Sequence, residues 1–236
     1  MNTLQIKLHS GGFVELLDNP RITKITVQYC KDSESESNCV VKFRDGKTFN
    51  LRIMCSSYNA QYGLPVSNDG TVIFAGTWER GIFAYDIITG MLLWRYPKGK
   101  ARTMIISNED LIVARANSSV FRLNIHSGQK SDLEIKSGTI ENIFPLSNKQ
   151  FFLKYYRGNC CVVNCKDFSI EHIFSKSEIN LHNCLSLLIN EVEIDNKNNV
   201  LIKGFEDYPN GLFNTHSIVG KEYSRALKSY TIKEGG

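Results

Sequence analysis

The sequence lacks the long apolar runs that membrane spans and export signals require. The N-terminal MNTLQIKLHSGG carries no extended apolar segment, and no other stretch approaches the ~20 apolar residues of a spanning helix. The seven cysteines are an odd number in a chain with no visible export signal, which favours reduced thiols. We therefore expect a cytoplasmic protein that has no membrane partner.

The sequence also lacks the motifs of common catalytic and metal sites. It contains no HxH, no His-Glu-x-x-His, no CxxC and no G-x-S-x-G, and its GTWERG loop (76–81) lacks the lysine and helix of a phosphate-binding loop. The net charge of +4, from 28 basic and 24 acidic residues, is too small to indicate nucleic acid binding. We expect no cofactor, no metal and no enzymatic activity.

What the sequence does contain is a short turn motif that recurs along the whole chain. The asparagines of successive motifs are separated by 49, 40, 40 and 48 residues. A short polar side chain followed by Asn suits a tight turn, because it bonds nearby backbone and Asn tolerates positive φ. The five copies are Asp18-Asn19, Ser67-Asn68, Ser107-Asn108, Ser147-Asn148 and Asp195-Asn196.

Short segments rich in β-branched and aromatic residues flank each turn, as is typical of strands. The first unit contains FVELL (13–17), ITKITVQYC (22–30), CVVKF (39–43) and TFNLRIM (48–54), and similar series follow. Four strands in about 40 residues make one blade of a β-propeller. The pattern predicts an all-β chain with one propeller domain over residues 1–236 and five four-stranded blades; the competing interpretation is a β-sandwich of unrelated hairpins.

One strand-like segment, TLQIKL (Thr3 to Leu8), precedes the first complete unit. We predict that it forms the outer strand of the fifth blade and so closes the ring, because this arrangement removes a free sheet edge. The C-terminal YTI segment (230–232) is the competing candidate for the same place.

The segment FAYDIITGMLLWRY (83–96) resembles the repeat of pyrroloquinoline-quinone-type propellers, in which an Asp, a Thr-Gly turn and a Trp recur. The matching residues are Asp86, Thr89, Gly90 and Trp94, and the third unit matches weakly through Asn124, Ser127 and Gly128. The resemblance implies propeller architecture and does not imply the quinone.

Some quinoprotein dehydrogenases of that family carry a vicinal disulfide at the cofactor, and this chain has adjacent cysteines at 160 and 161. Here the pair lies in the expected strand NCCVVNC (159–165), where neighbouring side chains point to opposite faces. We expect one buried and one exposed thiol, and no cofactor.

The remaining signal lies in the loops that join the second and third strands of each blade, which share a face with the loops between blades. Closure of the ring would bring the acidic loops KDSESESN (31–38) and FEDYPNG (205–211) together, across from Lys98, Lys100 and Arg102. Tyr, Trp and Arg dominate interface hot spots. The predicted partner-binding residues are Asp32, Glu34, Glu36, Trp78, Arg80, Tyr155, Tyr156, Arg157, Glu206, Asp207 and Tyr208.

These features favour a non-catalytic protein-binding propeller. In size and style the chain resembles immunity proteins of bacterial toxin systems, so we expect it to bind and neutralise a toxin, as an antitoxin does. An acidic sector suits a basic toxin domain such as a nuclease. A scaffold or regulatory interaction module is the alternative.

Two further alternatives are weaker. A sugar-binding or carbohydrate-active propeller would use inward carboxylates, for which Glu15, Glu141 and Glu193 are the candidates. RNA could stack on Tyr155 and Tyr156 beside the Lys98–Arg102 segment, but the acidic loops and mild net charge disfavour nucleic acid.

Overall fold

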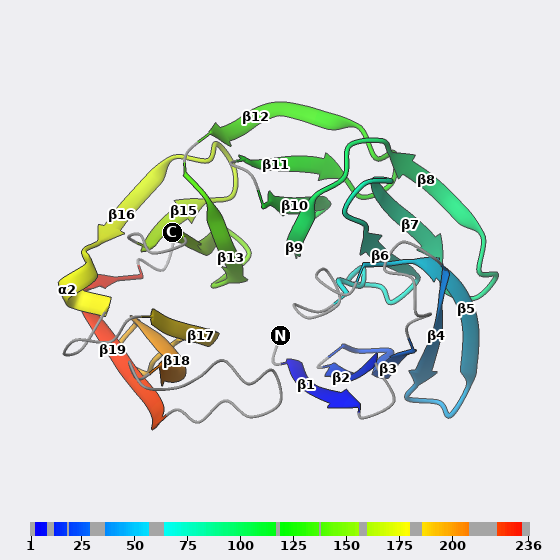
Figure 1. Ribbon diagram of the computed structural model, residues 1–236, viewed down its shortest axis with the longest axis horizontal. Coiled ribbons are helices and arrows are strands. Elements are labelled where there is room, and N and C mark those ends of the chain that lie inside the picture. Colours follow the sequence, from blue (N-terminus) through cyan, green and yellow to red (C-terminus); the bar gives the residue numbers. More distant parts are fainter. Residues whose placement is uncertain are drawn as a thin grey trace. The chain divides into compact units, whose positions relative to one another are not determined.

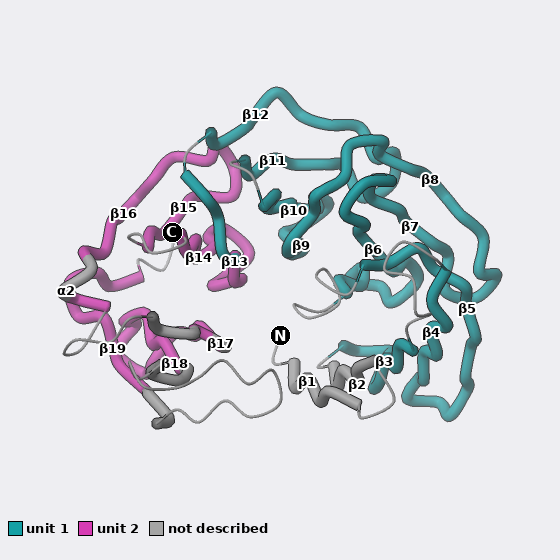
Figure 2. The backbone as a smooth tube through the Cα atoms, viewed as in Figure 1, with its two compact units in different colours: residues 1–142 teal, residues 143–236 magenta. Residues whose placement is uncertain are grey.

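The computed structural model describes residues 3–8, 12–17, 19–28, 36–56, 64–116, 119–136, 138–155, 160–179, 186–207 and 221–232. The elements in these stretches are β-strands and one four-residue helix, α2 (Lys176–Ile179), so the all-β class is confirmed. None of the described helices is long and apolar enough to cross a membrane. The chain divides into two compact units, residues 1–142 and 143–236 (Figure 2).

The first sheet, called sheet A, contains the four strands predicted for the first sequence repeat and one more. Its strands lie in chain order and are β1 (Thr3–Leu8), β2 (Gly12–Leu17), β3 (Ile22–Gln28), β4 (Glu36–Phe43) and β5 (Thr48–Met54) (Figure 1). The extra strand β1 pairs antiparallel with β2, from Thr3 opposite Leu17 to Leu8 opposite Gly12.

The pairing of β1 corrects one prediction. Residues Thr3 to Leu8 form an edge of sheet A and not the outer strand of the last sheet. The physical reason is chain entropy, because pairing with a segment only a few residues away closes a far shorter loop than pairing with the C-terminal region.

Sheets B and C follow in the first unit. Sheet B contains β6 (Val72–Gly76), β7 (Ile82–Asp86) and β8 (Leu92–Tyr96). The segment LPV (64–66) precedes the second turn as FVELL precedes the first, so the repeat predicts a strand there. It contributes only an isolated bridge between Val66 and Ile73, since Pro65 has no N–H with which to continue a ladder. Sheet C has all four predicted strands, β9 (Ala101–Ser107), β10 (Asp110–Arg115), β11 (Ser119–Asn124) and β12 (Lys130–Lys136).

Sheets D and E contain the remaining strands. Sheet D consists of β13 (Ile140–Pro145), which spans the unit boundary, β14 (Gln150–Tyr155), β15 (Cys160–Asn164) and β16 (Ile170–Phe174). Sheet E consists of β17 (Ser186–Ile194), β18 (Asn199–Asp207) and β19 (Lys221–Thr231). The C-terminal YTI segment (230–232) was the competing candidate for the outer strand of the last blade. Its residues Tyr230 and Thr231 end β19, which is the third strand of sheet E.

Apolar side chains join neighbouring sheets inside each unit. In the first unit, one cluster packs sheet A against sheet B, with Ile25, Ile53 and Ile73 fully buried, and a second packs sheet B against sheet C around Phe74 and Phe121. In the second unit, a cluster that includes Phe152, Phe174 and Ile202 joins sheets D and E. Burial of this apolar surface is the main favourable contribution to the stacking of the sheets.

The recurring turn motif marks a recurring hydrogen bond, which supports the repeat inferred from the sequence. In each of the five sheets, the backbone N–H directly after one strand (β4, β7, β11, β15 or β19) donates to a carbonyl in or next to the recurring turn. The five bonds are Arg44 to Arg21 (2.8 Å), Ile87 to Thr71 (2.8 Å), Ile125 to Glu109 (3.0 Å), Cys165 to Lys149 (2.7 Å) and Ile232 to Asn198 (2.7 Å).

The polar residues of the motif bond nearby backbone as the sequence predicts, but only one of the five motif asparagines, all of which the structure describes, adopts a positive φ. The Ser67 hydroxyl accepts from the N–H groups of Thr71 and Val72, at 3.2 and 2.9 Å. Asn108 adopts a φ of 55°, whereas in the fifth turn the left-handed residue is Asn198 (61°) and not Asn196. The turns thus have a structural role at one end of the strands.

Candidate functional site

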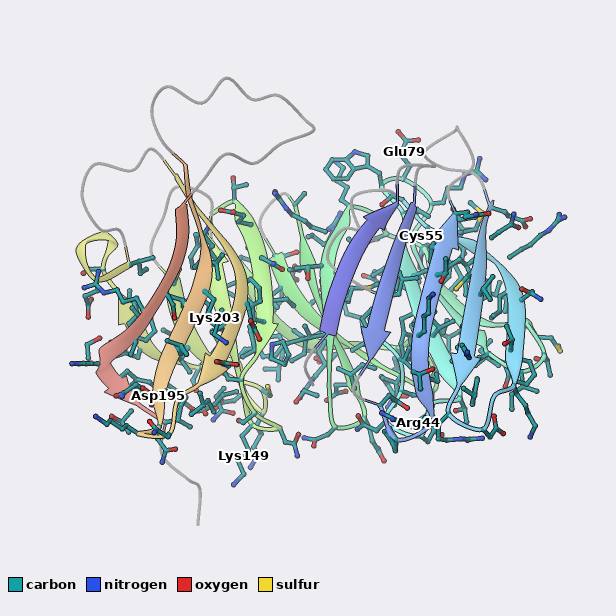
Figure 3. The ribbon with its side chains drawn as sticks, turned by 90° about the horizontal axis from the view of Figure 1, so that it is seen from below. Arg44, Cys55, Glu79, Lys149, Asp195 and Lys203 are labelled. Carbon is teal, nitrogen blue, oxygen red and sulfur yellow. The ribbon has the colours of Figure 1, made fainter. Side chains whose placement is uncertain are left out.

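The candidate surface in the first unit lies at the end of the strands opposite the recurring turns. Figure 3 shows Glu79 at one end of these strands and Arg44, which belongs to the turn region, at the other. The loop between β6 and β7 is closed by Thr77, whose N–H donates to the Gly81 carbonyl at 2.9 Å. The Thr77 hydroxyl also donates to that carbonyl (3.1 Å) and accepts from the Arg80 N–H (2.8 Å). This bonding holds Trp78, Glu79 and Arg80 in a defined loop.

The loop between β8 and β9 is bonded directly to the Thr77–Gly81 loop. The Lys100 N–H is shared between the carbonyls of Thr77 (3.1 Å) and Trp78 (2.7 Å), and Lys100 has a φ of 67°. Gly99 is buried and so close to the Trp78 carbonyl that a Cβ there would overlap it. A glycine is therefore required for the two loops to approach.

A third segment, at the end of β10, completes the cluster. The Ala116 N–H donates to the Lys100 carbonyl at 3.1 Å, and Arg115 Nε donates to the Gly99 carbonyl at 3.0 Å. Residues 77–81, 97–100 and 115–116 are thus joined mainly through backbone groups, and we call them the loop cluster. Loops fixed in this way on a rigid sheet present their side chains without much ordering cost on binding.

Cations predominate on the loop cluster and its border. Arg95 Nε and Nη2 donate to the Arg80 carbonyl, at 2.9 and 2.7 Å, and the Arg95 guanidinium lies 5.6 Å from the centre of the Phe83 ring. Glu79 is exposed and contributes a negative charge. The positive side chains are Arg80, Arg95, Lys98, Lys100, Arg102 and Arg115. Lys98, Lys100 and Arg102, which the sequence predicts to lie across from the acidic loops, therefore lie on or beside the loop cluster.

Two of the predicted partner-binding residues lie within the loop cluster. Trp78 is half-buried and Arg80 is exposed. Sequence reasoning missed Arg95 and Arg115, whose guanidinium groups brace the loop carbonyls. The only sign of their role in the sequence was their position, because each is an arginine near the end of a strand and next to a predicted loop.

The other predicted partner-binding residues do not belong to the loop cluster. Glu36 begins β4 and is exposed, with a distant 3.9 Å contact to Arg52 that contributes little in water. Tyr155 ends β14, is half-buried and hydrogen-bonds the Cys161 thiol. Glu206 and Asp207 belong to β18, for which the structure describes only the backbone at these positions. Outside the described residues lie Asp32, Glu34, Tyr156, Arg157 and Tyr208. The acidic sector remains a prediction.

The adjacent cysteines differ from the prediction of one buried and one exposed thiol. Cys160 and Cys161 are both buried, with exposed fractions of 0% and 2%, because apolar packing covers both faces of β15. Neither of the two forms a disulfide. Burial raises the pKa of Cys161 to about 12, despite the opposing hydrogen bond from Tyr155. Its reactive thiolate form is therefore scarce at neutral pH.

In the described part of the chain, the carboxylates considered for sugar chemistry do not form a cluster of unpaired acidic side chains. Glu193 is paired with Lys203 Nζ at 2.5 Å, and Glu191 lies 3.6 Å from the same nitrogen. Hydrogen bonding to Glu193 raises the pKa of Lys203, so the ammonium stays charged. Glu141 is half-buried, and only the backbone of Glu15 is described. Among the described residues, no His, Cys, Asp and Glu cluster could hold a metal ion.

Comparison with known proteins identifies the architecture. No family model matches the chain, and no curated protein sequence matches it either. Among solved structures, BamB from Moraxella catarrhalis matches with a TM-score of 0.53 and 12% identity, over 88% of this chain and 57% of that one. The Cps50 (Swd1) β-propeller domain from Myceliophteria thermophila matches with a TM-score of 0.59 and 9% identity, over 95% of this chain and 75% of that one. The chain spans little more than half the length of BamB. Identities this low show the fold alone, and that fold is β-propeller architecture.

Proposed function

We propose that this chain is a non-catalytic propeller that binds another protein through its loop cluster and through the acidic loops KDSESESN (31–38) and FEDYPNG (205–211). The observation that carries the proposal is the bonding of three loops from two sheets into one braced surface that presents Trp78 and Arg80. Trp and Arg are enriched among the residues that dominate protein interfaces.

The specific role that we propose is that of a cytoplasmic immunity protein, which covers and blocks a bacterial toxin. Support comes from the polarised charge of the loops: cations surround the described loop cluster, while KDSESESN and FEDYPNG supply carboxylates in the sequence. A basic nuclease domain would be attracted to the acidic loops and encounter them faster. A scaffold or regulatory module with a host partner is the second candidate.

We further propose that the five sheets are five blades closed into one ring, with repeats of the pyrroloquinoline-quinone type. The five equivalent backbone bonds support one blade per turn motif. Trp94 supports the repeat type, because its Nε1 donates to the Ile125 carbonyl (2.8 Å) while its ring lies against Gly128, where a Cβ would come within 2.6 Å. Small-angle scattering tests closure, since a ring and two independently moving units differ in their distance distributions.

The decisive experiment for function is affinity purification from the native cell, followed by binding measurements with purified partner. We expect Arg80→Glu and Trp78→Ala each to weaken binding about tenfold or more, as hot-spot residues do. Lys47→Glu, in the turn between β4 and β5, is the matched control because Lys47 is exposed and its salt bridge to Asp45 is solvent-accessible.

Two further results of this experiment distinguish the immunity role from the scaffold role. Charge reversal at Glu34, Glu36, Glu206 and Asp207 should slow association with a basic partner, most clearly at low salt. Recovery of metabolic enzymes and no toxin would contradict the immunity role and favour the scaffold. A partner that binds all of these variants as tightly as the wild type would overturn the proposed surface itself.

A further inference from the structure

Four cations of the loop cluster have no acidic partner in the part of the chain that the structure describes. Arg80 and Lys98 are exposed, whereas Lys100 and Arg115 are half-buried. Among the described residues, the four side chains make a single hydrogen bond, from Arg115 Nε to the Gly99 carbonyl at 3.0 Å. The ammonium groups and most of the guanidinium N–H groups are therefore left for another acceptor.

Three half-buried cations elsewhere in the molecule show a different arrangement, in which a carboxylate lies beside the positive charge. These pairs are Arg122 with Asp110 (3.2 Å), Lys130 with Glu134 (2.8 Å) and Lys203 with Glu193 (2.5 Å). A charge that is partly withdrawn from water without such a partner bears a desolvation cost. An added carboxylate would therefore be favourable beside Lys100 and Arg115.

Backbone bonding, and not pairing between side chains, brings the four cations together. The Lys100 N–H donates to the carbonyls of Thr77 and Trp78, and the Lys100 carbonyl accepts from Ala116. A Cβ on Gly99 would lie 2.8 and 2.9 Å from the carbonyl carbons of Trp78 and Glu79, so the two loops are in contact there. The positive charges consequently add up at one place on the surface.

Glu79 is the one acidic residue of the loop cluster, and it is exposed without a partner among the described residues. It interrupts the positive surface, which disfavours the continuous phosphate backbone of a nucleic acid. A single carboxylate side chain can instead approach Arg80, whose planar guanidinium matches it through two parallel hydrogen bonds. Trp78, half-buried in the same loop, is of a type enriched at protein interfaces.

We propose that the loop cluster receives an acidic segment of the partner protein. Asp or Glu side chains of that segment pair with Arg80 and Lys98 and approach the half-buried Lys100 and Arg115. The inference rests on the proposed protein-binding role and adds the chemistry of the partner at this surface. With basic groups of the partner facing the acidic loops, it gives the partner two regions of opposite charge, which would fix the orientation of binding.

Binding of the purified partner to a series of charge variants tests the inference by sign. Arg80→Gln and Lys98→Gln should each raise the dissociation constant about fivefold, because each removes an attraction. Glu79→Gln should lower it about threefold, because it removes a repulsion, and a gain of affinity does not arise from misfolding. Lys47→Gln, in the turn between β4 and β5, is the matched control and should leave the dissociation constant unchanged.

Salt gives a second readout on the same proteins. Raising the salt concentration from about 50 mM to about 500 mM should weaken binding of the wild type and reduce the differences between the variants, because both come from screened charges. Affinity that stays constant over this range, together with an unchanged dissociation constant in Glu79→Gln, overturns the acidic segment.

Model ligands separate protein carboxylates from nucleic acid phosphates. At low salt, a short oligoglutamate peptide should compete with the partner for the wild type and compete less well for Lys98→Gln. Oligothymidylate of equal charge should compete less than oligoglutamate. Stronger competition by oligothymidylate identifies a nucleic acid surface, and a lack of competition by oligoglutamate also overturns the inference.

The Trp78→Ala variant keeps the two levels of the argument apart. If it binds the partner as tightly as the wild type, the proposed protein-binding surface is wrong. If it binds more weakly while the variants of Glu79, Arg80 and Lys98 bind as the wild type does, the surface stands and the acidic segment is wrong.

Discussion

Sheet B buries apolar side chains on both of its faces, whereas the described side chains of sheet A, those of β3, β4 and β5, bury them on only one. In sheet B, Ile73 and Phe83 pack toward sheet A, while Phe74 and Ile82 pack toward sheet C. In sheet A, the face opposite the core carries Lys24, Thr26, Gln28, Asn38, Val40, Lys42, Asn50 and Arg52, which are half-buried or exposed. The difference follows from position, because within the first unit sheet B lies between two sheets and sheet A does not.

The contrast is also visible along single strands. β7 is buried at four consecutive positions, from Ile82 to Tyr85, whereas burial in β5 alternates between Leu51 or Ile53 and the exposed residues beside them. Continuous apolar runs are typical of strands covered on both faces and alternation of strands with one face in water. Strand sequence thus reports how many neighbours a sheet has.

The largest effect is expected from removing a side chain between two sheets. Phe74 is fully buried, with its ring centre 5.7 Å from that of Trp94. Phe74→Ala leaves a cavity that neither sheet can close, so we expect a loss of about 3–5 kcal/mol in the free energy of unfolding. Urea denaturation measures it. A loss below about 1 kcal/mol would show that sheet B is less tightly held than its burial indicates.

A pair of glycine variants compares the two sheets, because both glycines adopt a positive φ. Gly81, in the loop cluster, has a φ of 119°, and a Cβ would overlap the Tyr96 carbonyl; Gly46, in a sheet A turn, has a φ of 86° with nothing within 4 Å. We expect Gly81→Ala to cost about 2–3 kcal/mol and Gly46→Ala about 1 kcal/mol, because only the first adds a backbone collision to the φ strain. Thermal and urea unfolding of both variants give the two costs. Equal costs would mean that the sheet B loop can shift as freely as the sheet A turn.

The second unit offers a polar counterpart, since sheet E is joined to sheet D by side-chain hydrogen bonds as well as by apolar packing. Tyr230 Oη donates to Glu171 Oε2 at 2.6 Å, and Gln150 and Asn164 donate to the same carboxylate at 2.5 and 2.8 Å. Burial alone would raise the pKa of Glu171, but these hydrogen bonds outweigh it and hold the pKa below its ordinary value.

This network predicts a pH dependence. A lowered folded-state pKa stabilises the protein above the unfolded value of about 4.3 and loses that contribution as the pH falls through the folded value. Tyr230→Phe should cost about 1 kcal/mol at pH 7 and flatten the stability profile below pH 5, because one donor to the carboxylate is gone. Urea unfolding across pH 3–7 makes the measurement, with Tyr96→Phe as a control outside the network. An unchanged profile would exclude the carboxylate as the link between the sheets.

The smallest effect is expected on the polar face of sheet A. Asn50 is exposed on β5, so Asn50→Val should change the free energy of unfolding by no more than about 0.5 kcal/mol. A differential unfolding measurement against Leu51→Ala, on the buried face of the same strand, sharpens the contrast. A strongly stabilising or destabilising Asn50→Val would indicate that this face is covered, contrary to the comparison of sheets A and B.

Much of the architecture was predictable because it depends on local chemistry. The turn around Asp86 illustrates this: its carboxylate accepts from the Thr89 N–H at 2.7 Å and Gly90 adopts a φ of 71°, as the Asp and Thr-Gly pattern indicates. The predicted inner strand at Pro65 failed for an equally local reason, the missing N–H. The pairing partner of β1 could not be predicted from the sequence, because a strand pattern does not specify which strand it pairs with.

The candidate site was likewise predictable only in part. Trp78 and Arg80 were recognisable as loop residues of types common at interfaces. Their bracing by Lys100, Arg95 and Arg115 was not, since those bonds run between segments that are distant in the sequence and involve carbonyls that every residue possesses. Sequence shows which residues are suited to a surface but not which backbones hold it still.

By itself the sequence determined the all-β class and the recurring turns, because these depend on residues near one another in the chain. Only the tertiary structure decided that β1 pairs within sheet A, that both thiols of the Cys160–Cys161 pair are buried, and that β8, at the edge of sheet B, pairs with no described strand other than β7. These outcomes depend on which sheet faces are covered, and covering is a property of the packed chain: burial is produced by neighbours that meet only when the sheets stack.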